Sequence, residues 1–398
     1  MSEKTQKNPV TGIGRRHFLK TATAIGYGIC AAGSTLFVLP LSGNDKRGST
    51  RLAADGLPTH GELSDGLGFY SLIREHQASA PLYITLDLTP NATINQRLMG
   101  SASEKQLDAL EIMDLIDQMG KMKVLRLTFL GEQSFRNTDI LPYIQRADQH
   151  NISCAATSDG RDLNDDVLSE LSKIPFFNLN FSLDGSTAES HDKFSGSGSF
   201  SATTQSIKLA KNHGINVTVV TNATSENYAQ VEDILTLARE LKADTYHLRR
   251  YIPVDTETST KGLALTPEQA ESLLILQANE MERNGESTTK IVGVDPLGGD
   301  RKLFVESGVM SQHDNIYAWN VMCQSAATYM HITSNGLATP CTWMPASAGN
   351  VRQETLAAIW EQSGVFKMLR GRDSFDECVA HSFIEKGDMF AVDPLKWA

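Results

Sequence analysis

The stretch Leu82-Tyr-Ile-Thr-Leu-Asp-Leu88 is the first of several strand-like runs that alternate with amphipathic, helix-like segments. The predicted strands are Leu82–Leu88, Val124–Phe129, Ile152–Ala156, Phe177–Leu183, Val217–Thr221, Tyr246–Tyr251 and Lys290–Val294. The predicted helices are Gln106–Met119, Asp165–Lys173, Ser201–Asn212, Tyr228–Leu241 and Glu268–Asn284. Strands separated by helices form parallel βα units with right-handed crossovers. We therefore predict an α/β fold, a partial or full (β/α) TIM-like barrel whose functional site lies at the carboxyl ends of its strands.

Length and charge limit the kind of protein this can be. A chain of 398 residues is long enough for a large core and a second domain. Its formal net charge is −11 and it contains no basic stripe. Nucleic-acid binding depends on clustered lysine and arginine, so we expect no nucleic-acid partner.

The N-terminal segment resembles an export signal. Gly14-Arg-Arg-His-Phe-Leu-Lys20 fits the twin-arginine (Tat) pattern R-R-x-F-L-K, and an uncharged run over 21–40 follows it. We predict a signal at residues 1–44, a polar linker at 45–80, the Tat translocon as a partner and a periplasmic location. Cleavage of the signal is one alternative, for which Ala31-Ala-Gly33 offers small residues, but no clear cleavage motif follows the apolar run. The alternative is an uncleaved anchor in the inner membrane, because the run approaches the ~20 residues that span a bilayer.

The segment that begins with the first predicted strand, Leu82–Met99, resembles the cluster-binding opening of radical S-adenosylmethionine (SAM) proteins. In that family a strand ends in Leu-Thr and three cysteines follow with CxxxCxxC spacing. The corresponding positions here hold Ala92, Gln96 and Met99. Iron in such clusters is held by thiolates. The resemblance therefore implies a degenerate member of the family, with no SAM-cleaving 4Fe–4S cluster.

Two further motifs extend this resemblance over residues 81–300. Thr128-Phe-Leu-Gly-Glu-Gln133 stands where the family has the GGEP motif that holds the SAM amino group, and it retains Glu132. Phe181-Ser-Leu-Asp-Gly185, followed by His191-Asp192, is similar to the family's SLDG and HD stretch. The resemblance implies that Glu132 and Ser182 are vestiges of a SAM pocket. His191 and Asp192 could form an acid–base pair, but their place in the motif favours a structural turn.

The C-terminal part, residues 315–398, resembles a SPASM domain, the small α+β module that carries auxiliary iron–sulfur clusters in this family. Cys323, Gly336 and Cys341 match its first signature, C-x(9–15)-G-x4-C. The second signature keeps Cys378, and His381 takes the place of the next ligand. In the family these pairs serve two separate clusters, and neither set is complete here. Besides such remnants, three alternatives stay open: one Cys3His site for a metal or cluster, a disulfide, and buried thiols without a ligand.

Two functions follow from these observations. The leading hypothesis is an exported, radical-SAM-like pseudoenzyme that binds a peptide or protein and assists maturation or assembly of a periplasmic cofactor-containing protein. The alternative is an enzyme of the radical SAM/SPASM superfamily with a divergent iron–sulfur or other metal site that modifies a peptide or protein. Fold alone does not decide between them.

Overall fold

The structure is a computed structural model that describes residues 80–89, 105–131, 135, 140–252, 262–282, 287–293, 323–372 and 378–391. The predicted signal, nearly all of the linker, and Ala92, Gln96 and Met99 lie outside the described residues. Within the described ranges, no helix is both long enough and apolar enough to cross a membrane.

A ten-stranded sheet, ordered β10-β9-β8-β1-β2-β3-β4-β5-β6-β7, forms the centre of the fold. Its strands are β1 Tyr83–Asp87, β2 Arg126–Leu130, β3 Ser153–Ser158, β4 Asn178–Ser182, β5 Asn216–Ala223, β6 Thr245–Arg250, β7 Lys290–Gly293, β8 Tyr329–Ile332, β9 Leu337–Thr339 and β10 Gly349–Asn350. The strands from β1 to β7 pair in parallel and match the seven predicted runs. The predicted fold class is confirmed as a partial barrel of parallel strands.

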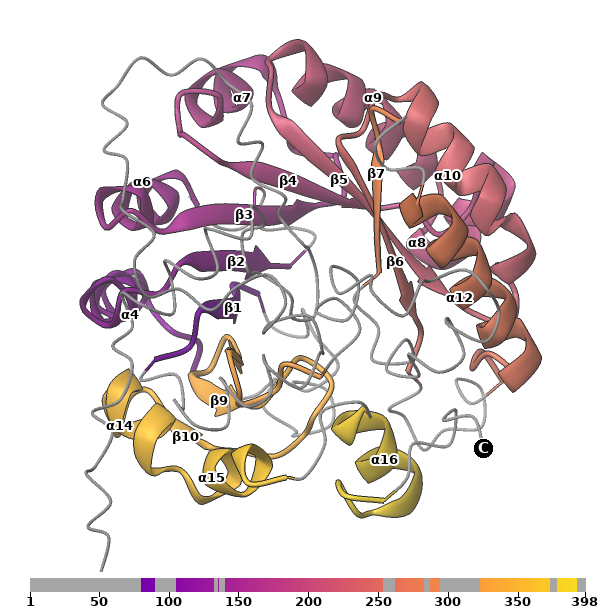
Figure 1. The fold of residues 1–398 in the computed structure, drawn as a ribbon. Helices are drawn as coiled ribbons and strands as arrows, with labels where there is room; N and C mark the ends of the chain where they lie inside the picture. The colour runs from indigo at the N-terminus through magenta and orange to yellow at the C-terminus, as the bar shows by residue number, and fades with distance from the viewer. Residues whose placement is uncertain are drawn as a thin grey trace, which may run out of the picture.

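Helices cover the outer face of the curved sheet (Figure 1). They are α4 Ala109–Met122, α6 Leu141–Gln149, α7 Asp165–Leu171, α8 Ala188–Ser195, α9 Ser199–Asn212, α10 Val231–Glu240 and α12 Pro267–Glu282, with a short 3-10 turn, η2 Tyr228–Gln230, before α10. The five predicted helices correspond to α4, α7, α9, α10 and α12. The sequence prediction missed α6 and α8. Helix α8 is mostly polar, and its start depends on a capping box in which Thr187 and Ser190 bond reciprocally.

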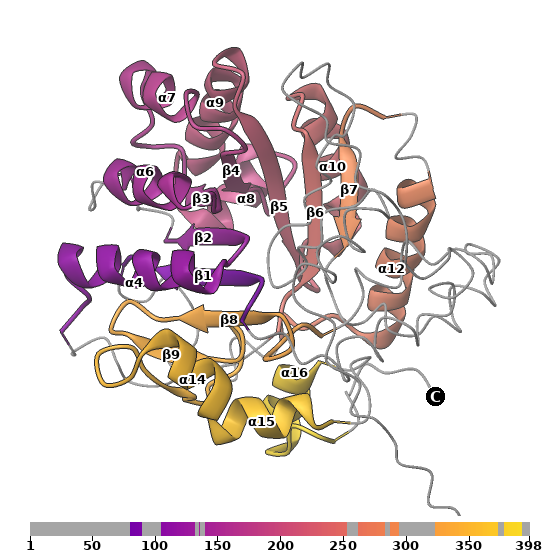
Figure 2. The same ribbon diagram turned by 60° about the vertical axis from the view of Figure 1, so that its left-hand side comes forward.

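The C-terminal part continues the barrel's sheet. Strand β8 runs parallel to β1, with Tyr83 opposite Tyr329 and Thr85 opposite His331 (Figure 2). Strands β9 and β10 extend it in antiparallel fashion. Three helices complete this part: α14 Leu356–Gln362, α15 Gly364–Arg370 and α16 Val379–Lys386. The SPASM-like module is therefore joined to β1 by backbone hydrogen bonds.

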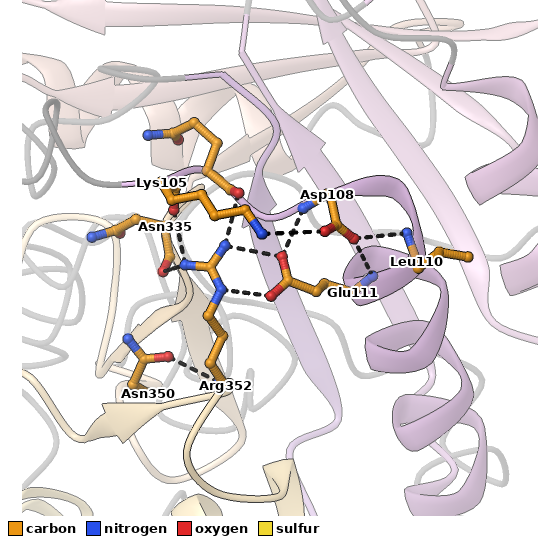
Figure 3. Close-up of polar contacts among 8 residues, drawn as sticks. Lys105, Asp108, Leu110, Glu111, Asn335, Asn350 and Arg352 are labelled. Carbon is orange, nitrogen blue, oxygen red and sulfur yellow. Dashed lines mark hydrogen bonds and ion pairs between the residues drawn. The ribbon is translucent and has the colours of Figure 1, made fainter.

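A second joint lies at the start of α4, where Arg352 bonds to five oxygens (Figure 3). Its Nε donates to Glu111 Oε1 at 2.6 Å and its Nη2 to Glu111 Oε2 at 2.9 Å. The same guanidinium donates to the backbone carbonyls of Lys105, Gln106 and Asn335 at 2.7–3.0 Å. A planar guanidinium suits this two-pronged contact with a carboxylate. Arg352 thus ties the C-terminal module to the N-terminal end of α4.

This joint predicts an acid-sensitive contribution to stability. Hydrogen bonding from Arg352, and next from the Asp108 backbone N–H, lowers the pKa of Glu111 from 4.5 to about 2. A depressed folded-state pKa stabilises the fold above pH 4.5, and that stabilisation is lost as the pH falls toward 2. Urea unfolding over this range should show the stability advantage of wild type over Glu111→Gln shrinking with acid. Parallel stability curves for the two proteins would contradict the assignment.

Candidate functional site

The two faces of the sheet differ in chemistry because side chains alternate along each strand. One set, including Ile84, Leu86, Leu179 and Phe181, packs in the hydrophobic core with the helices. The opposite face, which we call the lumen face, carries polar side chains that are also buried. They are Thr85, Asp87, Thr128, Asn178, Asn180, Thr218, His247 and His331. Buried polar groups require hydrogen-bond partners, so this face is the candidate site.

One cluster of polar side chains joins β1 to β8. Thr85 Oγ1 lies 2.9 Å from His331 Nδ1 and 2.8 Å from the Tyr329 hydroxyl. On the other side of the same imidazole, His331 Nε2 lies 3.2 Å from Asp87 Oδ2, and both side chains are fully buried. Tyr83 stacks on Tyr329 with ring centroids 5.2 Å apart. The SPASM-like module therefore contributes side chains to the lumen beside the end of β1.

A second cluster of polar side chains lies on β4, β5 and β6. Asn178 Nδ2 donates to Asn180 Oδ1 at 2.6 Å and to Thr218 Oγ1 at 3.2 Å. His247 is fully buried. Burial, and then the nearby Arg249, lower the pKa of His247 well below 6.5, so its ring is neutral. Ser182, one of the predicted SAM-pocket vestiges, follows Asn180 on the same face at the end of β4 and is part-buried. These residues place a neutral, hydrogen-bonding surface in the lumen.

The inherited SLDG turn is held by its own hydrogen bonds. The Asp184 N–H donates to His191 Nδ1 at 3.1 Å, and Asp184 Oδ1 accepts from the Asn222 N–H at 2.7 Å. Burial lowers the pKa of His191. Asp192 accepts hydrogen bonds from the backbone N–H groups of Gly198 and Phe200, which lower its pKa. These contacts support the structural interpretation of His191 and Asp192, although the pair lies on helix α8 rather than in a turn.

Gly185 in this turn provides a stability test. A Cβ added there would lie 2.4 Å from the backbone nitrogen of His191 and 2.4 Å from Ser190 Oγ. Because a backbone atom has to move, Gly185→Ala should lower the free energy of unfolding by about 1–2 kcal/mol in urea denaturation. Gly262→Ala is the matched control, since its added Cβ would have no heavy atom of the described residues within 4 Å apart from its chain neighbours. Equal stabilities for the two variants would contradict this account.

The four cysteines in the described ranges, Cys154, Cys323, Cys341 and Cys378, are buried thiols. Burial raises the pKa of Cys154 on β3 to about 12, as expected for a core residue. Burial, and then the neighbouring Cys323, raise the pKa of Cys341 to about 11. Cys341 and Cys378 share a small apolar cluster with Tyr83 and Tyr329.

His381 is oriented by a residue from the barrel. Arg250 Nη1 donates to His381 Nδ1 at 3.2 Å, which joins the end of β6 to α16. Among the described residues, no three His, Cys, Asp or Glu side chains gather closely enough to hold a metal ion. The structure thus brings Cys341 near both Cys323 and Cys378 without assembling all four predicted ligands. A metal site at Cys323, Cys341, Cys378 and His381 remains a prediction.

The GGEP-like segment lies only partly within the described residues. Leu130 ends β2 on the lumen face and is 8% exposed, and its carbonyl accepts from the Leu88 N–H at 3.0 Å. Gly131 has a φ of 120°, a conformation that favours glycine. Glu132, the other predicted vestige, lies outside the described residues. A leucine side chain therefore stands at the strand end that the resemblance assigns to ligand binding.

Two family models match the chain. Residues 97–238 match the model described as the radical SAM superfamily, and residues 323–380 match SPASM, an iron–sulfur cluster-binding domain. The fold and these matches together define a radical SAM barrel with a C-terminal SPASM domain. Residues 97–238 are therefore identified as a radical SAM domain and residues 323–380 as a SPASM domain.

Several known proteins align with most of this chain at low identity. The AdoMet-dependent heme synthase of Oleidesulfovibrio alaskensis is 22% identical over 307 residues, covering 73% of this chain and 79% of the relative. The mycofactocin maturase MftC of Mycobacterium tuberculosis is 26% identical over 318 residues, covering 76% of each. The crystal structure of Streptococcus suis SuiB has a TM-score of 0.62 at 14% identity and covers 84% of this chain and 82% of SuiB.

The radical SAM and SPASM domains imply iron–sulfur clusters, which need cysteine thiolates as ligands. At the three positions that the sequence resemblance assigns to the barrel signature, the chain has a methyl group in Ala92, an amide in Gln96 and a thioether in Met99. Cluster iron is held by cysteine thiolates, and these side chains supply none. The donor set at these positions does not fit a SAM-cleaving cluster. In the SPASM domain, Cys323, Cys341 and Cys378 are donors of the required type.

Proposed function

We propose that this protein is an exported, radical-SAM-like pseudoenzyme. In this proposal it binds a peptide or protein and assists maturation or assembly of a periplasmic cofactor-containing protein. The observation that carries the proposal is that Ala92, Gln96 and Met99 stand where the sequence resemblance places the three cluster cysteines. Reductive cleavage of SAM needs a low-potential cluster, which these side chains cannot anchor. The Arg15-Arg16 signal is consistent with this, because the periplasm is oxidising.

The names of relatives support a peptide or protein as the bound molecule. SuiB has been crystallised bound to its precursor peptide SuiA, and another relative, from Gluconobacter oxydans, is named a PqqA peptide cyclase. The relatives named AdoMet-dependent heme synthase support a connection to cofactor production. The neutral, hydrogen-bonding side chains of Asn178, Asn180, Thr218 and His247 on the lumen face suit a ligand that offers hydrogen bonds, as a peptide does.

Two measurements test this proposal on the full chain. Anaerobic reconstitution with iron and sulfide should yield no SAM cleavage and no cluster that depends on positions 92, 96 and 99. Pull-down of the exported form from periplasm should recover a peptide or protein partner, with the same chain lacking residues 14–20 as the unexported control. SAM cleavage by the wild-type chain, or the absence of any partner, would contradict the proposal.

The second candidate is a superfamily enzyme with a divergent metal site. The observation in its favour is that Cys341 lies near both Cys323 and Cys378 in the SPASM domain. Elemental analysis of purified protein separates the two candidates, because a complete ligand set retains stoichiometric metal. Stoichiometric iron or zinc that is lost in Cys341→Ser would favour the enzyme.

A further inference from the structure

His247 and Asn180 on the lumen face have hydrogen-bonding atoms that no group in the described part of the chain satisfies. Neither ring nitrogen of His247 has a hydrogen-bond partner among the described residues, and the same is true of Asn180 Nδ2. His247 is 0% exposed and Asn180 is 1% exposed. Buried polar atoms without partners are costly and rare in native proteins. These unsatisfied atoms are therefore suited to form hydrogen bonds with a bound molecule that is not part of the protein chain.

The strand register places the two side chains around one part of the lumen. Asn180 on β4 lies opposite Thr218 on β5, which lies opposite Thr245 on β6. His247 follows Thr245 by two residues and so shares its face. Because the sheet curves around the lumen (Figure 1), side chains on its inner face converge. A small group between the side chains of β4 and β6 could contact both His247 and Asn180.

The orientation of the Asn180 amide is fixed by its neighbour. Asn180 Oδ1 accepts a 2.6 Å hydrogen bond from Asn178 Nδ2, so the Asn180 amide nitrogen is the end without a partner. Since the His247 ring is neutral, one of its nitrogens donates and the other accepts. The unsatisfied set is therefore two donor atoms and one acceptor atom.

We propose that His247 and Asn180 bind a carboxamide group in the barrel lumen. An amide carbonyl accepts two hydrogen bonds and an amide N–H donates one, which complements the unsatisfied set. A carboxylate only accepts, and an ammonium group only donates. Neither would satisfy both kinds of atom. The inference rests on the proposed function, because a bound peptide would supply the amide from its backbone or from an asparagine or glutamine side chain.

The test uses the full chain with 15N-labelled histidine and follows the ring nitrogens by NMR. The probes are N-methylacetamide, which mimics the backbone, propanamide, which mimics a side-chain amide, and acetate. We expect a saturable shift of the His247 resonances with one or both amides and none with acetate. The stronger amide identifies the source of the group. Loss of the amide response in His247→Leu would support the site, and this variant should fold because it removes unsatisfied buried atoms.

His213→Leu is the matched control, since His213 lies on the outer surface beside Asp165 and should leave the response unchanged. A stronger response to acetate, no shift with either amide, or equal binding by His247→Leu would overturn the inference. Peptide capture that is the same in wild type and His247→Leu would refute this site and leave the proposed function standing. Amide shifts without any captured peptide would refute the proposed function and leave the site standing.

Discussion

Replacement of Arg352 by methionine is expected to lower the free energy of unfolding by about 2–3 kcal/mol. The guanidinium donates two hydrogen bonds to the Glu111 carboxylate and three to backbone carbonyls. Methionine keeps an apolar stem of similar length and removes every donor. Loss of the guanidinium leaves the part-buried Glu111 carboxylate, which is 29% exposed, without its cation. Urea denaturation of both proteins at neutral pH measures the difference.

The control for this experiment is Lys105→Met, a substitution of the neighbouring cation. Lys105 lies 3.4 Å from Asp108 and its side chain is 74% exposed. Exposed ion pairs contribute little, so the control should lose less than about 0.5 kcal/mol. The account of the joint is wrong if Lys105→Met and Arg352→Met have the same effect. Arg352→Met should also raise the pKa of Glu111, because the Arg352 hydrogen bond is the main cause of its depression.

The barrel could be predicted from the sequence because its signals are local. Each of β1 to β7 is a short run bounded by helix signals, and parallel order follows from the helices between the strands. The contribution of β8 could not be predicted in this way. Tyr329–Ile332 is only four residues long, and its partner β1 lies far away in the sequence. Such pairing depends on tertiary contacts that no local pattern records.

The candidate site was predicted only where it follows inherited motifs. Ser182, predicted as a vestige of the SAM pocket, lies on the lumen face, whereas Asn180, His247 and His331 were not predicted as site residues. The sequence did contain a signal for this polar face. Buried parallel strands are usually continuous apolar runs, so polar residues within such a strand stand out. Asn178 and Asn180 alternate with apolar residues in β4, which indicates a polar inner face. Which of these polar atoms lack partners depends on side-chain geometry and could not be inferred from the sequence.

Asp87 and His331 are expected to behave as one coupled unit in a double-mutant cycle. Their side chains are fully buried, with His331 Nε2 placed 3.2 Å from Asp87 Oδ2. Each of Asp87→Leu and His331→Leu leaves the other polar group buried beside an apolar side chain. We expect each single variant to lose about 3 kcal/mol of unfolding free energy.

The double variant should lose at least about 2 kcal/mol less than the sum of the two single losses, because both members of the pair are then removed together. Urea denaturation gives the four free energies, and hydrogen exchange in β1 and β8 shows whether the joint between barrel and SPASM domain opens first. Asp148→Leu, at an exposed position on α6, serves as the control and should change stability by less than about 0.5 kcal/mol. Additive losses would show that the two side chains do not interact. The joint would then depend on its other contacts, among them the β1–β8 backbone pairing and the Arg352 hydrogen bonds.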